Sequence, residues 1–176
     1  LAPIADDMLE VERIIREEVS SAVSRVDEVG HYMTEAGGKR MRPALLMLIC
    51  RALGYEGTLH QYLGATIELL HTATLMHDDV VDESDMRRGR PTANSRWGNG
   101  AAVLVGDFFL STALRQGVST GDIRILRSLS DLGRLLSIGE LDEMYTARTN
   151  DLSEDAYFQI IFRKTASLFM SLSLIR

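Results

Sequence analysis

The sequence predicts an all-α protein, a bundle of helices that forms one domain over residues 1–176. Apolar residues recur every three or four positions along most of the chain, which is the spacing of a helix with one buried face. No segment alternates polar and apolar residues for long enough to predict a strand. The chain has three prolines and no low-complexity tract or linker, so we expect a single unit.

The expected helices follow one another closely, and their ends carry recognisable signals. Gly30 and Gly54 end the first two helices, and Pro43 opens the second. Ser153, followed by two acidic residues, is a typical N-cap for the last helix. The periodicity places the helices at residues 8–29, 43–53, 60 into the acidic segment 78–82, 99–116, 122–148, and from 154 onward.

Charge and composition exclude several function classes. A net charge of −6 argues against binding to nucleic acid or to an anionic membrane surface. The single cysteine, Cys50, provides no disulfide framework. We see no signal peptide at Leu1, and no apolar run approaches the roughly 20 residues that span a bilayer. We therefore expect a cytoplasmic protein without a transmembrane segment.

The most informative segment, residues 77–90, is a run of acidic residues followed directly by arginines. On a helix, Asp78 and Asp82 share a face and repel each other unless a cation lies between them, and Mg²⁺ prefers such hard oxygen ligands. Arg87 and Arg88 are the type of side chain that binds phosphate through paired hydrogen bonds. A solvated acidic helix end before a basic loop would also fit. The apolar residues 69–76 instead indicate that the acids end a buried helix, which favours a diphosphate site.

A second motif, GGKRMRP, occupies residues 37–43. Its two glycines allow backbone N–H groups to approach an anion. Lys39 and Arg42 lie at the start of the helix that Pro43 opens, where the helix dipole also favours negative charge. The alternative is a glycine-rich turn with exposed basic side chains.

Together, in this order, the two motifs resemble the trans-type isoprenyl diphosphate synthases, and in particular the medium- and long-chain, octaprenyl-type members. The resemblance covers GGKRMRP, LLHTATLMHDDVVDESDMRRG, LVGDFF and FRKTASLF. It implies an isoprenoid synthase-type helical bundle around a central cavity, and a homodimer. It also implies an Mg²⁺-dependent prenyltransferase that condenses isopentenyl diphosphate with an allylic diphosphate into an all-trans polyprenyl diphosphate.

The resemblance also implies roles for individual residues. His71 lies seven residues before Asp78, about two turns along nearly the same helix face, which favours a ligand over a packed core histidine. The implied catalytic acids are Asp78, Asp79 and Asp82, of which Asp78 and Asp82 ligate the metal. The implied isopentenyl diphosphate site consists of Lys39, Arg42, His71 and Arg88. The implied allylic diphosphate site consists of Arg87, Lys164 and Thr165.

Small residues precede the acidic motif. Ala73 and Thr74 stand five and four residues before Asp78, where short-chain members of the family carry a bulky ring that stops elongation. Their small size implies an open tunnel with its floor deeper, near Leu129. We therefore expect a medium- to long-chain product, because each added CH₂ group is favourable to bury until side chains block the tunnel.

The family carries a second aspartate-rich motif on a later helix, and this chain reaches Arg176 without one. We therefore expect the chain to hold the N-terminal half of the family's domain, truncated before that motif, and to be a poor catalyst by itself.

Two other functions stay open. A class I terpene cyclase needs no second diphosphate site, so GGKRMRP and the arginine pair argue against it. A non-catalytic partner subunit typically has degraded motifs, whereas these are intact.

Overall fold

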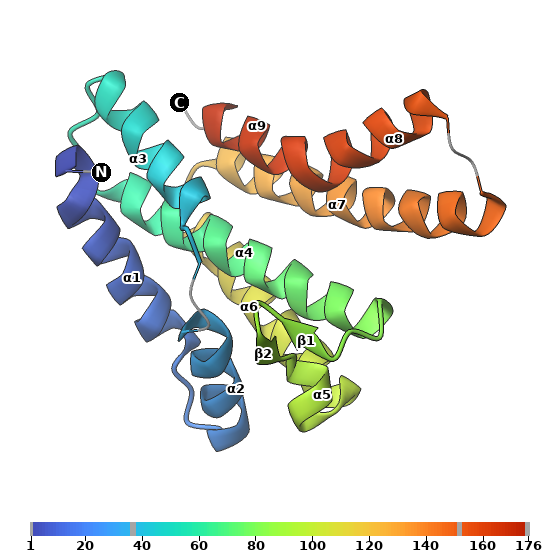
Figure 1. Cartoon of the computed structure of the whole chain (residues 1–176). Coiled ribbons are helices and arrows are strands. Elements are labelled where there is room, and N and C mark those ends of the chain that lie inside the picture. The colour runs from blue at the N-terminus through green and yellow to red at the C-terminus, as the bar shows by residue number, and fades with distance from the viewer. Residues whose placement is uncertain (1, 36–37, 151–152, 175–176) are drawn as a thin grey trace. The chain divides into compact units, whose positions relative to one another are not determined.

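The computed structural model describes residues 2–35, 38–150 and 153–174, most of which lie in helices (Figure 1). The all-α prediction is therefore confirmed. The chain divides into two compact units, Leu1–Ser119 and Thr120–Arg176, and each is described by itself. The expected single domain over residues 1–176 stays a prediction.

Helix α4 is the centre of the first unit, where it packs against α1, α3, α5 and α6. Every residue of α4 from 63 to 70 is buried, and the acidic motif lies at the end of the helix. The prediction that the acids end a buried helix is thus confirmed. After a short 3₁₀ turn, η1 (Ala2–Ile4), the helices of this unit are α1 (Ala5–Val19), α2 (Ser24–Glu35), α3 (Met41–Ala52), α4 (Leu59–Val81), α5 (Ala93–Trp97) and α6 (Asn99–Ser119).

The helix predicted over residues 8–29 is wrong, because the structure has two helices there, α1 and α2. The hydroxyl of Ser20 donates to the carbonyl of Arg16 (2.9 Å), and the Ser20 backbone turns to an extended conformation, as serine often does at a helix end. Gly30 does not end a helix but lies inside α2. A Cβ atom there would come within 3.2 Å of the Val19 carbonyl oxygen, so the glycine allows the two helices to pack closely.

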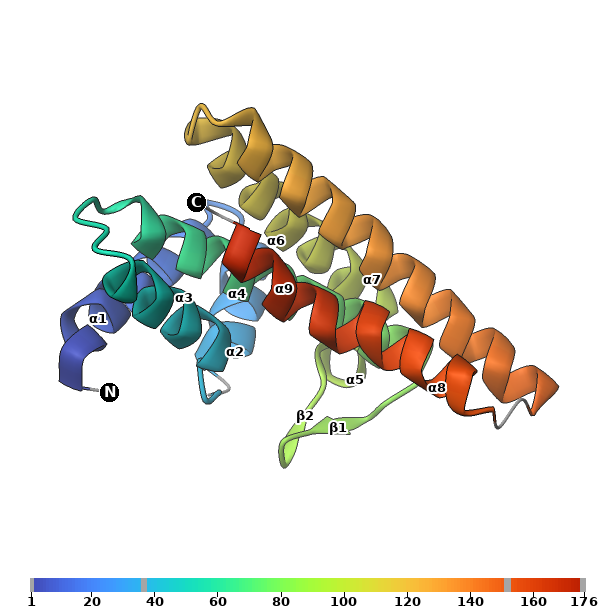
Figure 2. The same ribbon diagram turned by 90° about the horizontal axis from the view of Figure 1, so that it is seen from above.

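The prediction that no strand forms is also wrong at one place in the first unit. The strands β1 (Met86–Arg87) and β2 (Arg90–Pro91) form an antiparallel hairpin with Met86 opposite Pro91 and Arg87 opposite Arg90, visible in Figure 2 beside α5. Arg88 and Gly89 form its turn with φ of 53° and 76°, the pattern of a type I′ turn. Strands of two residues are too short for an alternating pattern to show in the sequence.

The second unit is a long helix, α7 (Ile123–Thr149), with a second helical segment returning along it (Figure 1). That segment consists of α8 (Glu154–Ile161), a single π-helical stretch η2 (Phe162–Ala166) and α9 (Ser167–Leu174). The predicted N-cap is confirmed, because the Ser153 hydroxyl accepts from the Ala156 N–H (3.3 Å). Gly139 of α7 allows the close approach, since a Cβ atom there would lie 2.8 Å from the Cβ of Arg163.

Candidate functional site

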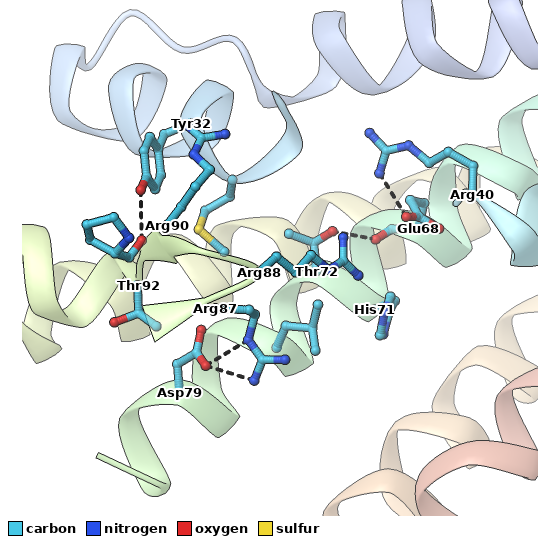
Figure 3. Close-up of a pocket in the computed structure, with 13 residues that line it drawn as sticks. Tyr32, Arg40, Glu68, His71, Thr72, Asp79, Arg87, Arg88, Arg90 and Thr92 are labelled. Carbon is cyan, nitrogen blue, oxygen red and sulfur yellow. Dashed lines mark hydrogen bonds and ion pairs between the residues drawn. The ribbon is translucent and has the colours of Figure 1, made fainter. Parts of the chain in front are cut away.

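A cationic pocket opens in the first unit between α2, the second half of α4 and the hairpin (Figure 3). It contains four arginines and two acidic side chains, and it includes four of the residues predicted from the sequence. Its lining residues are Tyr32, Met33, Arg40, Glu68, His71, Thr72, Leu75, Asp79, Arg87, Arg88, Arg90, Pro91 and Thr92.

The metal-binding candidates lie at the C-terminal end of α4. Asp82 is the C-cap residue, and its N–H donates to the carbonyl of Asp78 (2.8 Å), so the two carboxylates stay one helical turn apart on one face. Asp78 is half-buried and Asp82 is exposed. A helix C-terminus carries the negative end of the dipole and disfavours carboxylates. The fold therefore holds these acids where a cation would stabilise them.

This pair fits a magnesium ion that is shared with a ligand. Among the described residues, no group of three or more His, Cys, Asp or Glu side chains could hold a metal by itself. Mg²⁺ is usually bound through one or two carboxylates, with waters and substrate phosphates as its other ligands. Asp78 and Asp82 supply the hard oxygen donors for that arrangement.

Asp79 is buried, with 1% of its surface exposed, and it binds Arg87. Its Oδ1 accepts a hydrogen bond from Nε of that arginine (2.8 Å) and forms an ion pair with Nη2 (2.7 Å), as the dashed lines in Figure 3 mark. A guanidinium has more N–H donors than these two contacts use. Asp79 therefore orients Arg87, while the arginine retains donors for a phosphate. The sequence motif groups Asp79 with the other acids and gives no signal for this pair.

Arg88 lies at the tip of the hairpin, next to the glycine-rich motif. A Cβ atom on Gly38 would lie 3.0 Å from Nη1 of Arg88, so the missing side chain makes room for the guanidinium. Arg88 has a left-handed backbone (φ 53°), which is uncommon for a residue other than glycine, asparagine or aspartate. Such conformations are concentrated at functional sites, where the surrounding structure maintains them.

Positive charge surrounds His71, which is half-buried. Burial, and after it the charges of Arg42, Arg88, Arg87 and Arg40, together lower the pKa of its imidazole to about 3. Burial also lowers the pKa of Arg42, and the charge of Arg88 adds to that effect. His71 is therefore neutral near pH 7, and the cluster has a positive field that a bound anion would neutralise.

Arg40 is a site residue that the sequence did not single out. It is the N-cap of α3 with a left-handed backbone (φ 46°). Its guanidinium donates to Glu12 (2.6 Å) on α1, to Glu68 (2.8 Å) on α4 and to the carbonyl of Thr34 (2.9 Å) on α2. Arg40 thus fixes the chain segment between Lys39 and Arg42 against three helices. The adjacent Lys39 and Arg40 of the motif are the sequence feature that could have pointed to this role of Arg40.

Several of the site residues predicted from the sequence do not line the cationic pocket. Lys39 is exposed and does not line the cationic pocket. Lys164 and Thr165 belong to the second unit, where both lie in the π-helical stretch η2. Lys164 pairs there with Glu140 (2.7 Å) and Glu143, and although burial opposes it, these carboxylates raise the pKa of the ammonium group. Their assignment to an allylic diphosphate site stays a prediction.

The chain-length candidates differ in their surroundings. Ala73 is buried, and it is seven residues after Thr66, which bonds Gln116 of α6 (2.7 Å), so it lies on the face of α4 toward α6. Thr74 is half-buried and lies between His71 and Asp78 on the neighbouring face. Leu129 is buried in α7 of the second unit, 5% exposed.

Comparison with known proteins identifies the family. The sequence pattern of the polyprenyl synthetase family matches residues 23–174, which is most of the chain. The chain belongs to the polyprenyl synthetase family. The resemblance inferred from the motifs is therefore confirmed, and so is the fold class that it implied.

Among its relatives, the chain is 44% identical to the octaprenyl diphosphate synthase of Escherichia coli over 165 residues, which cover 94% of this chain and 51% of that protein. It is 46% identical over 170 residues to an all-trans-nonaprenyl-diphosphate synthase (geranyl-diphosphate specific) of Rhodobacter capsulatus, covering 96% of this chain and 52% of the relative. The chain thus spans about half the length of the curated relatives that it matches.

Solved structures agree with this assignment. A decaprenyl diphosphate synthase from Rhodobacter capsulatus superposes with a TM-score of 0.94 at 43% identity, over 98% of this chain and 53% of that one. A polyprenyl synthase from Caulobacter crescentus, complexed with calcium and isoprenyl diphosphate, superposes with a TM-score of 0.94 at 37% identity. That match covers 98% of this chain and 52% of the Caulobacter chain. In the described part of this family member, no helix has the length and apolarity to cross a bilayer.

Proposed function

We propose that the whole protein is a prenyltransferase that joins isopentenyl diphosphate to an allylic diphosphate and makes a medium- or long-chain all-trans polyprenyl diphosphate. The observation that carries this proposal is that arginines gather around His71. His71 itself lies on α4, the helix that ends with the acid pair Asp78 and Asp82. The octaprenyl and nonaprenyl diphosphate synthases among the chain's relatives support the proposal. A homodimer and a cytoplasmic location stay predictions.

In the proposed reaction, the C–O bond of the allylic substrate breaks and its electron pair leaves with the diphosphate. The double bond of isopentenyl diphosphate then attacks the allylic carbon, a C–C bond forms, and a proton is lost. No side chain needs to act as a nucleophile. The protein's task is to hold the two substrates in line and to neutralise the leaving group.

The residues of the first unit suit this task. Arg87, oriented by the buried Asp79, would hold the allylic diphosphate. Arg42, Arg88 and the neutral His71 would hold isopentenyl diphosphate, with the exposed Lys39 nearby in sequence. Magnesium, when bound, would supply positive charge to the leaving diphosphate. The residues that would hold it are Asp78 and Asp82.

Separate binding of two diphosphates is the test of this function. In the whole protein, Lys39→Ala or Arg42→Ala should mainly raise the KM for isopentenyl diphosphate, because these groups bind the ground and transition states alike. Arg87→Ala should instead raise the KM for the allylic diphosphate. Steady-state kinetics with each substrate varied in turn would check this. Equal effects of all three variants on both substrates would contradict two sites, and turnover of the allylic diphosphate alone would favour a cyclase.

A substitution at the hairpin tip should separate function from folding. Asparagine accepts a left-handed backbone more readily than arginine, so Arg88→Asn should leave the melting temperature unchanged or slightly higher. The same variant should raise the KM for isopentenyl diphosphate about tenfold, since a hydrogen bond to a charged group is worth about 1.5–3 kcal/mol. Arg25→Asn, at an exposed arginine of α2, is the control and should change neither. An unchanged KM in Arg88→Asn would remove Arg88 from the site.

Aromatic substitutions before the acidic motif should shorten the product. Phenylalanine at Ala73 or Thr74 would narrow the path of the growing chain. Because Ala73 is buried on the α6 side, Ala73→Phe should also cost about 1–3 kcal/mol of stability through overpacking. Thr74→Phe, at a half-buried position, should shorten the product without that loss. Product lengths can be read by chromatography, and an unchanged distribution in Thr74→Phe would contradict the assignment.

A further inference from the structure

The hairpin that carries Arg87 and Arg88 has little to hold it in place by itself. Its ladder has two residues on each strand, and Pro91 has no N–H to donate. Hairpins of this size are at best marginally stable in isolation. The position of both arginines therefore depends on contacts that the hairpin makes with other elements.

The hairpin also contains a repulsive pair. Arg87 and Arg90 stand directly opposite each other, so their side chains project from the same face, and like charges placed in this way destabilise a ladder. Asp79 compensates the first of them. The second lies over the ring of Tyr32, with its guanidinium carbon 4.3 Å from the ring centroid, a cation–π contact.

Tyr32, on α2, makes further contacts around the hairpin, among them a second cation–π contact with Arg96 of α5, whose guanidinium carbon lies 4.9 Å from the ring centroid. Its hydroxyl donates to the carbonyl oxygen of Pro91 (2.7 Å), as Figure 3 shows. Its ring meets the edge of Trp97 on α5, with centroids 4.9 Å apart and an interplanar angle of 80°. One side chain thus contacts the second strand twice and the helix that follows it.

The same end of α2 also holds the other cationic segment. The carbonyl of Thr34, two residues after Tyr32, accepts a hydrogen bond from Arg40 (2.9 Å), the residue that fixes the glycine-rich motif. The last turns of α2 therefore contact both the hairpin and the segment that leads into Arg42. Such a helix sets the spacing between the two groups of arginines.

We propose that Tyr32 is a positioning residue for diphosphate binding, which holds the hairpin so that Arg87 and Arg88 face the ligand. This inference rests on the proposed function. Tyr32 acts through the hairpin and touches no reacting atom. Because oriented groups lose much of their effect when displaced by about 1 Å, a loosened hairpin should weaken ligand binding even though all the arginines are present.

The test measures binding of inorganic pyrophosphate to the whole protein by calorimetry in the presence of Mg²⁺. Tyr32→Leu removes the hydrogen bond and the ring, and it should raise the Kd about tenfold. Tyr32→Phe keeps the ring and should raise the Kd only about threefold, a partial rescue by the conservative variant. Tyr62→Leu, at an exposed tyrosine of α4 that does not line the pocket, is the matched control and should leave the Kd unchanged.

A double-mutant cycle tests the contact itself. Arg90→Met combined with Tyr32→Leu should weaken binding by less than the product of the two single effects, because both changes break one contact. Independent effects would overturn the shared role, and so would a lower melting temperature in Tyr32→Leu with unchanged pyrophosphate affinity. If the wild-type protein bound no pyrophosphate, the proposed function would fail and this inference with it. If the wild-type protein bound pyrophosphate and the Tyr32 variants bound it with the same Kd, this inference alone would be overturned.

Discussion

Replacing Asp78 or Asp82 by alanine in the whole protein should reduce turnover by several orders of magnitude and leave the fold intact. Removing one electrostatic group from a preorganised site commonly costs about 10²–10³-fold in rate, and a metal ligand should cost at least as much. The fold should persist, because both carboxylates lie at the C-terminal end of α4, where the helix dipole disfavours them. Rates should be measured with saturating substrates, and folding by circular dichroism.

A neighbouring acid provides the control for this result. Asp85 is exposed and lies beyond the helix end, so Asp85→Ala should retain most of the activity. Raising the Mg²⁺ concentration should partly restore a single variant that retains one ligand, and it should not restore the Asp78→Ala, Asp82→Ala double variant. Near-normal turnover in that double variant would refute the metal assignment.

The largest expected effect on stability comes from Arg40→Leu. Arg40 and Glu68 form a hydrogen-bonded ion pair whose side chains are 14% and 9% exposed. Removing one partner of a buried pair leaves an uncompensated charge and typically costs about 3–5 kcal/mol. The Oε2 atom of Glu68 is already buried without a hydrogen bond within the described residues, and without Arg40 this carboxylate would keep its charge interaction with Arg42. Urea unfolding would measure the loss.

Two further variants serve as the control and the rescue for Arg40→Leu. Arg25→Leu removes an arginine whose pair with Glu28 is exposed, and it should cost at most about 1 kcal/mol. Adding Glu68→Gln to Arg40→Leu should recover part of the lost stability, because the buried charge is then gone. A loss in Arg40→Leu no larger than in Arg25→Leu would show that the buried pair does not stabilise the fold.

The sequence predicted most helices well, because their apolar periodicity is long and their ends carry local signals such as Ser153. It failed where the deciding contact is distant or the element is short. The periodicity runs through Ser20 without a visible break, and Gly30 permits packing against Val19 instead of ending a helix. The hairpin at Arg88 is too short to produce any pattern.

The chemistry of the candidate site follows the same division. The sequence by itself determined the all-α class, the family and the identity of the acids and bases, because these depend on residue type and on spacing along single helices. The tertiary structure alone decided that Asp79 orients Arg87, that Arg40 ties three helices together and that Tyr32 supports the hairpin. Those contacts join residues that no helical repeat relates, and some of them link a side chain to a backbone carbonyl of another element. Their partners become visible only when the chain is folded.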